Sequence, residues 1–200
     1  MSTCFEVYPT NNNIPEFSTI ISKSVSMFED FLKFHKIETY INTEVYAVHE
    51  NKVISEPQFI TNKENTYNTI EINNIGTIYL FYIKHNDFYN GMWNDEIKNN
   101  SRAKILENSI LKNRRIGYSW DIKRTVGQPA IVSLFYGFVA MAIAREADGF
   151  IYSDDGAWSY ELFPTEWQNL YSEYFNIDSI KNPDTKSTVK NWINLLKKEH

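Results

Sequence analysis

Residues 129–144 read PAIVSLFYGFVAMAIA, a run of sixteen residues without a charged side chain, flanked by Gln128 and Arg145. A helix that is apolar on every side belongs either to the centre of a folded domain or to a membrane. Sixteen residues are fewer than the roughly 20 that a helix needs to cross a bilayer. We therefore expect this segment to be a central helix buried on all sides, and we expect no membrane association.

Strand-like segments flank this helix, Arg115–Ile122 before it and Phe150–Ser153 after it. Strand, helix and strand within this length are typical of a βαβ unit with a right-handed crossover. If the two strands are parallel neighbours, their carboxyl ends lie together, where α/β sheets usually bind ligands. Gly149 is expected to end the helix.

The rest of the chain adds a short sheet and several amphipathic helices. Apolar residues recur at helical spacing in Glu16–His35, and together with Pro164–Phe175 this segment is the expected cover of the central helix. The other expected elements are strands Cys4–Tyr8, Thr39–His49, Thr66–Ile72 and Ile75–Lys84 and helices Trp93–Asn113 and Ser187–Lys198, with Asn73 and Asn74 in a hairpin turn.

These elements predict a mixed α+β fold: an antiparallel-rich sheet with a central buried helix at residues 129–145, covered by amphipathic helices. Two hundred residues suit a single domain, 1–200, to which the helix 187–198 is a possible appendage. A polar segment, 176–184, separates that last helix from the rest.

Composition restricts the class of function. The chain is 42% hydrophobic and 16% aromatic, which supplies a core and leaves aromatic rings for an interaction surface. A net charge of −5 does not favour general nucleic-acid binding. The single cysteine, Cys4, excludes an internal disulfide and a multi-cysteine zinc site. The first residues show no basic and apolar leader pattern, so we expect a cytoplasmic protein.

Acidic residues gather in one part of the sequence. From residue 145 to residue 178 the only basic residue is Arg145, and a solvated surface is the ordinary explanation of such a run. The acidic residues there are Glu146, Asp148, Asp154, Asp155, Glu161, Glu166, Glu173 and Asp178.

No catalytic signature appears. The four histidines occur singly, and the sequence contains no GxSxG, Walker A or GxGxxG motif. Cys4 has no evident catalytic partner in the sequence. We therefore expect neither an enzyme nor a bound cofactor or metal.

One alternative is a metal-dependent nuclease. Asp121-Ile-Lys123 closes a predicted strand, and an Asp-x-Lys at a strand end is part of some metal-dependent nuclease sites, which also need a second acid on a neighbouring strand. Asp154 or Asp155, after the strand Phe150–Ser153, could supply that acid. The same Asp154-Asp155-Gly156 is also typical of a hairpin turn whose carboxylates face water.

The segment 117–175 resembles a family of proteins. Its motifs are Gly117-Tyr-Ser-Trp120, Ala147-Asp-Gly-Phe-Ile-Tyr-Ser-Asp-Asp-Gly-Ala-Trp158 and Phe163-Pro164. It is similar to immunity proteins encoded beside bacterial polymorphic toxins, including those of contact-dependent growth inhibition systems. These proteins differ in structure, so the resemblance implies a function and no particular fold or site.

The resemblance implies a cytosolic protein that binds and neutralises a cognate protein toxin, such as a nuclease. A nuclease has a basic substrate cleft, which an inhibitor blocks with acidic groups and aromatic anchors. A third hypothesis is a scaffold that docks through the basic helix Ser187–Lys198. The candidate partner-binding residues combine the acidic stretch with its rings: Asp154, Asp155, Trp158, Tyr160, Glu161 and Glu166.

Overall fold

Eight strands among the described residues form one antiparallel sheet, in the order β3-β2-β4-β5-β6-β1-β7-β8. The computed structural model describes residues 2–50, 52–54, 66–153, 162–174 and 176–198. The strands are β1 (Ser2–Tyr8), β2 (Thr43–His49), β3 (Lys52–Ile54), β4 (Thr66–Ile72), β5 (Gly76–Lys84), β6 (Tyr118–Thr125), β7 (Phe150–Tyr152) and β8 (Thr165–Glu166). The helices are α1 (Phe17–Phe34), α2 (Asp87–Asn99), α3 (Ser101–Ile105), α4 (Glu107–Ile116), α5 (Ala130–Glu146), α6 (Trp167–Asn169) continued by the π-helical turn η2 (Leu170–Tyr174), and α7 (Pro183–Lys198).

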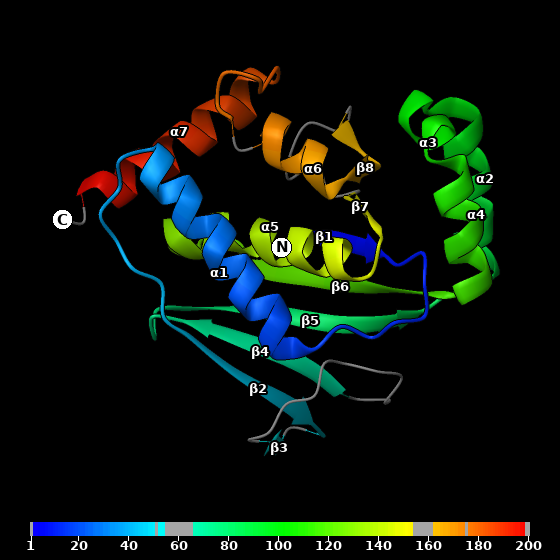
Figure 1. Cartoon of the computed structure of the whole chain (residues 1–200), viewed down its shortest axis with the longest axis horizontal. Helices are drawn as coiled ribbons and strands as arrows, with labels where there is room; N and C mark the ends of the chain where they lie inside the picture. The colour runs from blue at the N-terminus through cyan, green and yellow to red at the C-terminus, as the bar shows by residue number, and fades with distance from the viewer. Residues whose placement is uncertain (1, 51, 55–65, 154–161, 175, 199–200) are drawn as a thin grey trace.

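Helix α5 is the centre of the fold, and every residue from Ala130 to Ala144 is buried. It lies across the sheet, and α1, α6 and α7 lie on the same side of the strands (Figure 1). The ring of Phe28 in α1 is 5.4 Å from that of Phe135 and 5.2 Å from that of Phe138. The mixed α+β fold with a buried central helix is confirmed. Within the described part of the chain, no helix has the length and apolar character needed to cross a bilayer.

Helix α7 is longer than expected and packs against α5. It begins at Pro183 instead of Ser187, because the side chain of Asn182 accepts hydrogen bonds from the backbone N–H groups of Asp184 and Thr185, both at 3.0 Å. Its apolar stripe is buried, and its Trp192 ring lies 5.3 Å from the guanidinium carbon of Arg124 in β6. The buried residues of the stripe are Val189, Ile193 and Leu196.

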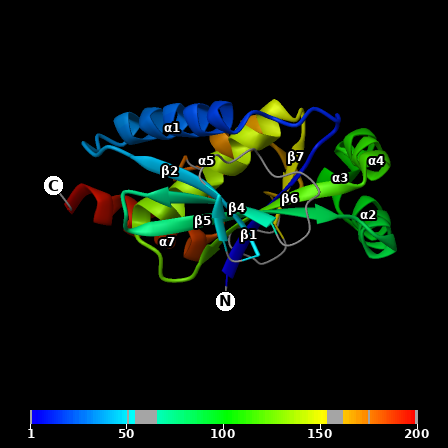
Figure 2. The same ribbon diagram turned by 90° about the horizontal axis from the view of Figure 1, so that it is seen from below.

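The single helix predicted for Trp93–Asn113 is wrong. The chain forms α2, α3 and α4 there, and these three helices gather at one end of the sheet (Figure 2). Asn86 starts the group early by accepting a hydrogen bond from the Phe88 N–H at 3.0 Å. Asn100 leaves helical geometry and its side chain caps α3, which divides the predicted helix.

The predicted pairing of the strands beside α5 is also wrong. Strand β1 lies between β6 and β7 and pairs antiparallel with both, so β6 and β7 are parallel but not neighbours. The periodicity of a segment indicates a strand–helix–strand unit but not whether a strand from elsewhere inserts into it. Here the N-terminal strand supplies that insertion.

Three boundaries differ from the predicted ones. Gly117 ends α4 with φ +80°, so the strand predicted from Arg115 begins at Tyr118 and extends to Thr125. The strand predicted from Thr39 begins at Thr43. The helix predicted from Pro164 begins at Trp167, because Thr165 and Glu166 pair with β7 instead.

The sequence predicts that Gly149 ends α5, but Asp148 and Gly149 end this helix together. Asp148 takes the left-handed conformation after α5, with φ +47°. The Gly149 N–H donates to the Ala144 carbonyl at 2.7 Å, which satisfies the helix end. A β-carbon on Gly149 would lie 2.6 Å from the Tyr8 carbonyl oxygen, so glycine is required there for the close approach of β1.

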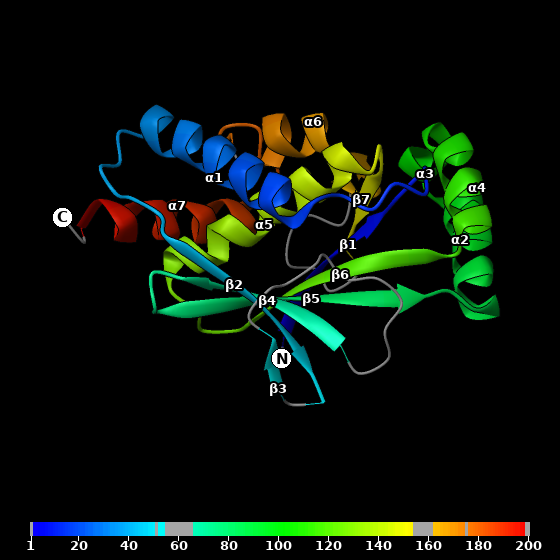
Figure 3. The ribbon, with the colours of Figure 1, turned by 60° about the horizontal axis from the view of Figure 1, so that its bottom comes forward.

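The two faces of the sheet have different surroundings. Helices α1, α5, α6 and α7 all lie on one side of β2, β4 and β5 (Figure 3). On that side the strands place fully buried apolar side chains under α5, including Phe5, Ile70, Leu80 and Ile122. No helix among the described residues covers the other side of β2, β4 and β5. We call that side of the sheet, continued onto β6 and β1, the open face, and cross-strand pairing assigns to it Glu6, Glu44, Tyr46, Tyr67, Glu71, Tyr79, Phe81, Asp121 and Lys123.

Candidate functional site

Most of the predicted partner-binding residues lie outside the described residues. These are Asp154, Asp155, Trp158, Tyr160 and Glu161, so their part in binding stays a prediction. Glu166 is described and is exposed on β8, the last strand of the sheet. Its carboxylate makes no ion pair or hydrogen bond with a described residue. Glu166 is therefore available to a partner.

Two small hollows meet at Glu166. One, of about 110 Å³, runs along Arg102, Pro164 and Asn169, and the other, of about 120 Å³, runs along Lys112, Arg145 and Trp167. Both are lined by Leu106 and Glu166. A site for a nucleotide or a cofactor measures roughly 300–1,000 Å³. These hollows fit single side chains better than such ligands.

The predicted Asp-x-Lys motif lies in the middle of β6 and not at its end. Asp121 is only 8% exposed, and its backbone pairs with Glu6 on one side and Phe81 on the other. The Lys123 Nζ lies 2.9 Å from Asp121 Oδ2, so the two motif residues form an ion pair on the open face. The strand extends beyond the expected end at Ile122 because β1 and β5 both pair with it.

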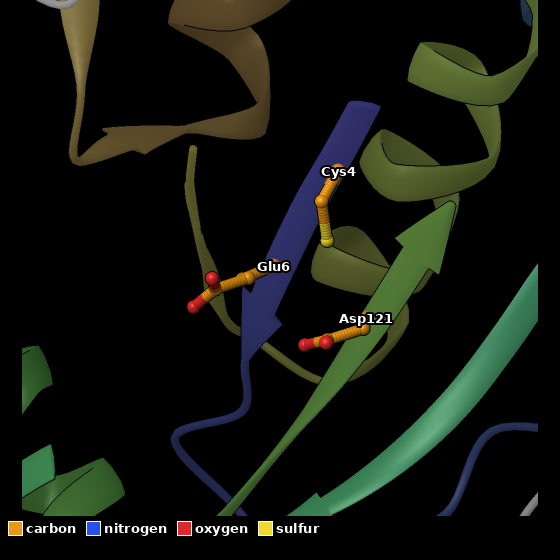
Figure 4. Close-up of side chains that lie close together, drawn as sticks. All are labelled: Cys4, Glu6 and Asp121. Carbon is orange, nitrogen blue, oxygen red and sulfur yellow. The ribbon is translucent and has the colours of Figure 1, made fainter. Parts of the chain in front are cut away.

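A second acid does lie beside Asp121, but it comes from β1. Figure 4 shows Cys4 and Glu6 on β1 and Asp121 on the adjacent β6. One ligand atom of each residue lies within 4.8 Å of the other two, close enough to hold one metal ion. A thiolate with two carboxylates suits a divalent metal ion such as zinc or manganese.

The electrostatics of this cluster favour positive charge. Burial lowers the pKa of Lys123, but the Asp121 carboxylate, followed by Cys4 and Glu6, raises it to a net value above the ordinary one. The Tyr8 hydroxyl donates a hydrogen bond to Glu6, and burial together with Glu6 raises the pKa of Tyr8. The cluster thus already holds one ammonium group.

The open face beyond the cluster is aromatic and acidic. The Tyr67 ring lies 5.3 Å from that of Phe81 and 6.1 Å from that of Tyr79. The Lys123 ammonium lies 5.3 Å from the centre of the Phe81 ring. Tyr46, Tyr67, Tyr79 and Phe81 are all partly exposed. Among the described residues of this face, Lys123 is the only basic one, and it is outnumbered by the acidic residues Glu6, Glu44, Glu71 and Asp121.

The sequence contains an alternating pattern that indicates this face, although the candidate partner-binding residues do not include it. In β4 the residues Tyr67, Thr69 and Glu71 alternate with Asn68, Ile70 and Ile72. Such alternation is typical of a strand with one covered and one solvated face. The signal identifies a surface in each strand, but only the register shows that the strands join their surfaces into one.

The chain matches no protein-family model, no curated protein and no solved structure.

Proposed function

We propose that this chain is an immunity protein that binds and neutralises a cognate bacterial toxin, and that the toxin is a nuclease. The observation that carries the proposal is the open face, where four partly exposed rings lie on the same side of the sheet as Glu6, Glu44, Glu71 and the buried Asp121, which pairs with Lys123. The resemblance of residues 117–175 to immunity proteins supports it independently. The same hypothesis assigns Glu166 and the stretch before it to the interface.

Physical chemistry connects such a surface with such a partner. The active-site cleft of a nuclease is basic because its substrate is a polyanion. Carboxylates aimed at a basic cleft raise the association rate by electrostatic steering, and buried aromatic anchors slow dissociation. The chain has a net charge of −5, and the open face carries both kinds of group.

The first test is binding to the toxin encoded by the adjacent gene. We expect the purified full chain to form a complex with that toxin and to abolish its cleavage activity. The association rate, measured by surface plasmon resonance, should fall at least about tenfold between 50 mM and 500 mM salt, because screening shortens the reach of charge. No complex, or an association rate that does not depend on salt, would contradict the proposal.

The second candidate function is a metal-dependent nuclease, which the proximity of Glu6 to Asp121 favours. Cys4, Glu6 and Asp121 would hold the divalent ion, and Lys123 lies beside it. A bound divalent ion can activate a water molecule and neutralise charge on a phosphodiester. The surroundings oppose this function, since a strongly acidic face repels a polynucleotide.

Metal titration separates the two candidates. If the chain is a nuclease, wild type should bind zinc or manganese in calorimetry and cleave plasmid DNA with it, and Asp121→Asn should abolish cleavage. Asp95→Asn, an exposed position on α2, is the control and should change nothing. Absence of metal-dependent cleavage by wild type would eliminate the nuclease and leave the immunity proposal standing.

A further inference from the structure

Two glutamates face each other across neighbouring strands of the open face. Glu44 of β2 is directly opposite Glu71 of β4 in the antiparallel register. Neither carboxylate makes an ion pair or hydrogen bond with a described residue, and Glu44 is exposed while Glu71 is partly exposed. Like charges directly opposite each other destabilise a sheet. The pair therefore works against the fold that carries it.

An aromatic ring lies next to this pair. Tyr46 follows Glu44 on the same face of β2, and its backbone pairs with Thr69, two residues before Glu71. Burial raises the pKa of the Tyr46 hydroxyl, with smaller contributions from Glu71, Tyr79 and Tyr67. The proximity of these groups places two carboxylates at the edge of an aromatic surface.

Lys123 shows how the open face accommodates a cation. Its ammonium lies 2.9 Å from a carboxylate oxygen of Asp121 and 5.3 Å from the centre of the Phe81 ring. A carboxylate and a ring together hold the cation by an ion pair and a cation–π interaction. Glu44, Glu71 and Tyr46 offer the same combination of groups, but no described basic side chain fills it.

We propose that Glu44 and Glu71, with Tyr46 beside them, are the docking point for a basic side chain of the partner protein. This inference rests on the proposed function and specifies which part of the open face meets the basic surface of the toxin. A guanidinium group suits the site best, because it binds carboxylates through two parallel hydrogen bonds and stacks on aromatic rings. Binding then relieves the repulsion between the two glutamates.

A protein side chain fits this point better than a metal ion. Hard divalent ions take six or more oxygen ligands, whereas Glu44 and Glu71 offer two carboxylates. Arginine and tyrosine are instead enriched among the residues that carry most of the binding energy of protein interfaces. The same two carboxylates, of Glu44 and Glu71, then repel each other in the unbound protein and attract the basic side chain of the partner in the complex.

The test compares two variants that each remove two negative charges. Glu44→Gln/Glu71→Gln changes the docking point. Glu29→Gln/Glu38→Gln changes two exposed glutamates, on α1 and in the connection between α1 and β2, that do not belong to the open face. Both use the full chain, and the probe is the toxin encoded by the adjacent gene.

We expect the docking-point variant to be more stable and to bind more weakly. Its melting temperature should rise by about 1–3 °C, because the repulsion is removed. Its Kd for the toxin should rise at least about tenfold more than that of the control variant, mainly through slower association with a smaller salt dependence. Opposite directions for stability and affinity exclude misfolding as the cause.

Each other outcome has a distinct meaning. If both variants bind like wild type, or lose the same affinity, the docking point is wrong while the immunity function stands. A lower melting temperature of the docking-point variant would show that the two glutamates support the fold, which overturns the inference as well. Failure of wild type to bind the toxin would refute the proposed function itself.

Discussion

Replacing Phe138 by alanine is expected to lower the free energy of unfolding by about 3–5 kcal/mol. Phe138 is fully buried in α5, and its ring lies 5.2 Å from that of Phe28, 5.5 Å from that of Phe31 and 6.3 Å from that of Tyr171. It thereby joins α5 to α1 and to the π-helical turn η2. The truncation removes apolar contacts and leaves a cavity that three separate elements would have to move to fill. Urea denaturation followed by circular dichroism measures the loss.

Phe34→Ala is the matched control for this variant. The Phe34 side chain is 73% exposed at the end of α1, so its removal should change the free energy of unfolding by no more than about 0.5 kcal/mol. A loss below about 1 kcal/mol for Phe138→Ala, or an equal loss for both variants, would contradict the central role of α5. The comparison holds the residue type constant and varies only burial.

The central helix could be predicted because its signal is local. An uncharged apolar run too short for a membrane has few alternatives in a folded domain, and α5 is buried throughout Ala130–Ala144. The hairpin is local too, since Asn73 and Asn74 both take positive φ angles, of 50° and 55°, between β4 and β5. Asparagine tolerates that conformation, which is why two consecutive asparagines are enough to predict the turn.

The sheet order could not be predicted because it depends on contacts between distant parts of the chain. Strand β1 pairs Phe5 with Ile122 of β6 and Val7 with Ile151 of β7. It therefore lies between β6 and β7, which the sequence predicts to be neighbours. Nothing in the periodicity of β1 distinguishes a central strand from an edge strand of this sheet. The choice is made by burial, since both faces of β1 carry buried residues.

The same insertion explains how far the site could be predicted. A metal-dependent nuclease needs a second acid beside Asp121, and the sequence predicts this acid after the strand Phe150–Ser153. The structure places Glu6 beside Asp121, because β1 and not β7 is the neighbour of β6. The need for a second acid follows from the hypothesis of a metal site, but the residue that lies beside Asp121 depends on topology. The position of Asp154 and Asp155 lies outside the described residues, so their role stays a prediction.

Alternate residues of the same strand lie on opposite faces of the sheet, one buried and the other partly exposed. In β5, Ile78 and Leu80 are fully buried beneath α5, while Tyr79 and Phe81, which alternate with them, are partly exposed on the open face. The helices that bury one face therefore fix the geometry of the other. The proposed binding surface is therefore held in place from the opposite side of the sheet, with no described helix above it.

Replacing Tyr79 by alanine is expected to weaken the complex with the cognate toxin by at least about 30-fold, equivalent to about 2 kcal/mol. Tyr79 lies in the central strand β5, with Lys123 of β6 on one side and Thr69 of β4 on the other. A partly exposed ring at the centre of a surface is the position from which a partner excludes water most completely, and tyrosines there are frequent energetic anchors. Most of the loss should therefore come from faster dissociation of the complex, measured by surface plasmon resonance.

Two controls separate the role of the Tyr79 ring from the stability of the sheet. Tyr79→Phe keeps the ring and should keep most of the affinity, whereas Tyr40→Ala removes a tyrosine that is 75% exposed outside the open face and should leave affinity unchanged. Melting temperatures of all three variants identify any loss that comes from unfolding. Unchanged toxin dissociation in a folded Tyr79→Ala protein would mean that the partner does not bury the centre of the open face. The acidic stretch that includes Glu166 would then be the remaining candidate interface, because it combines carboxylates with aromatic residues on a separate part of the chain.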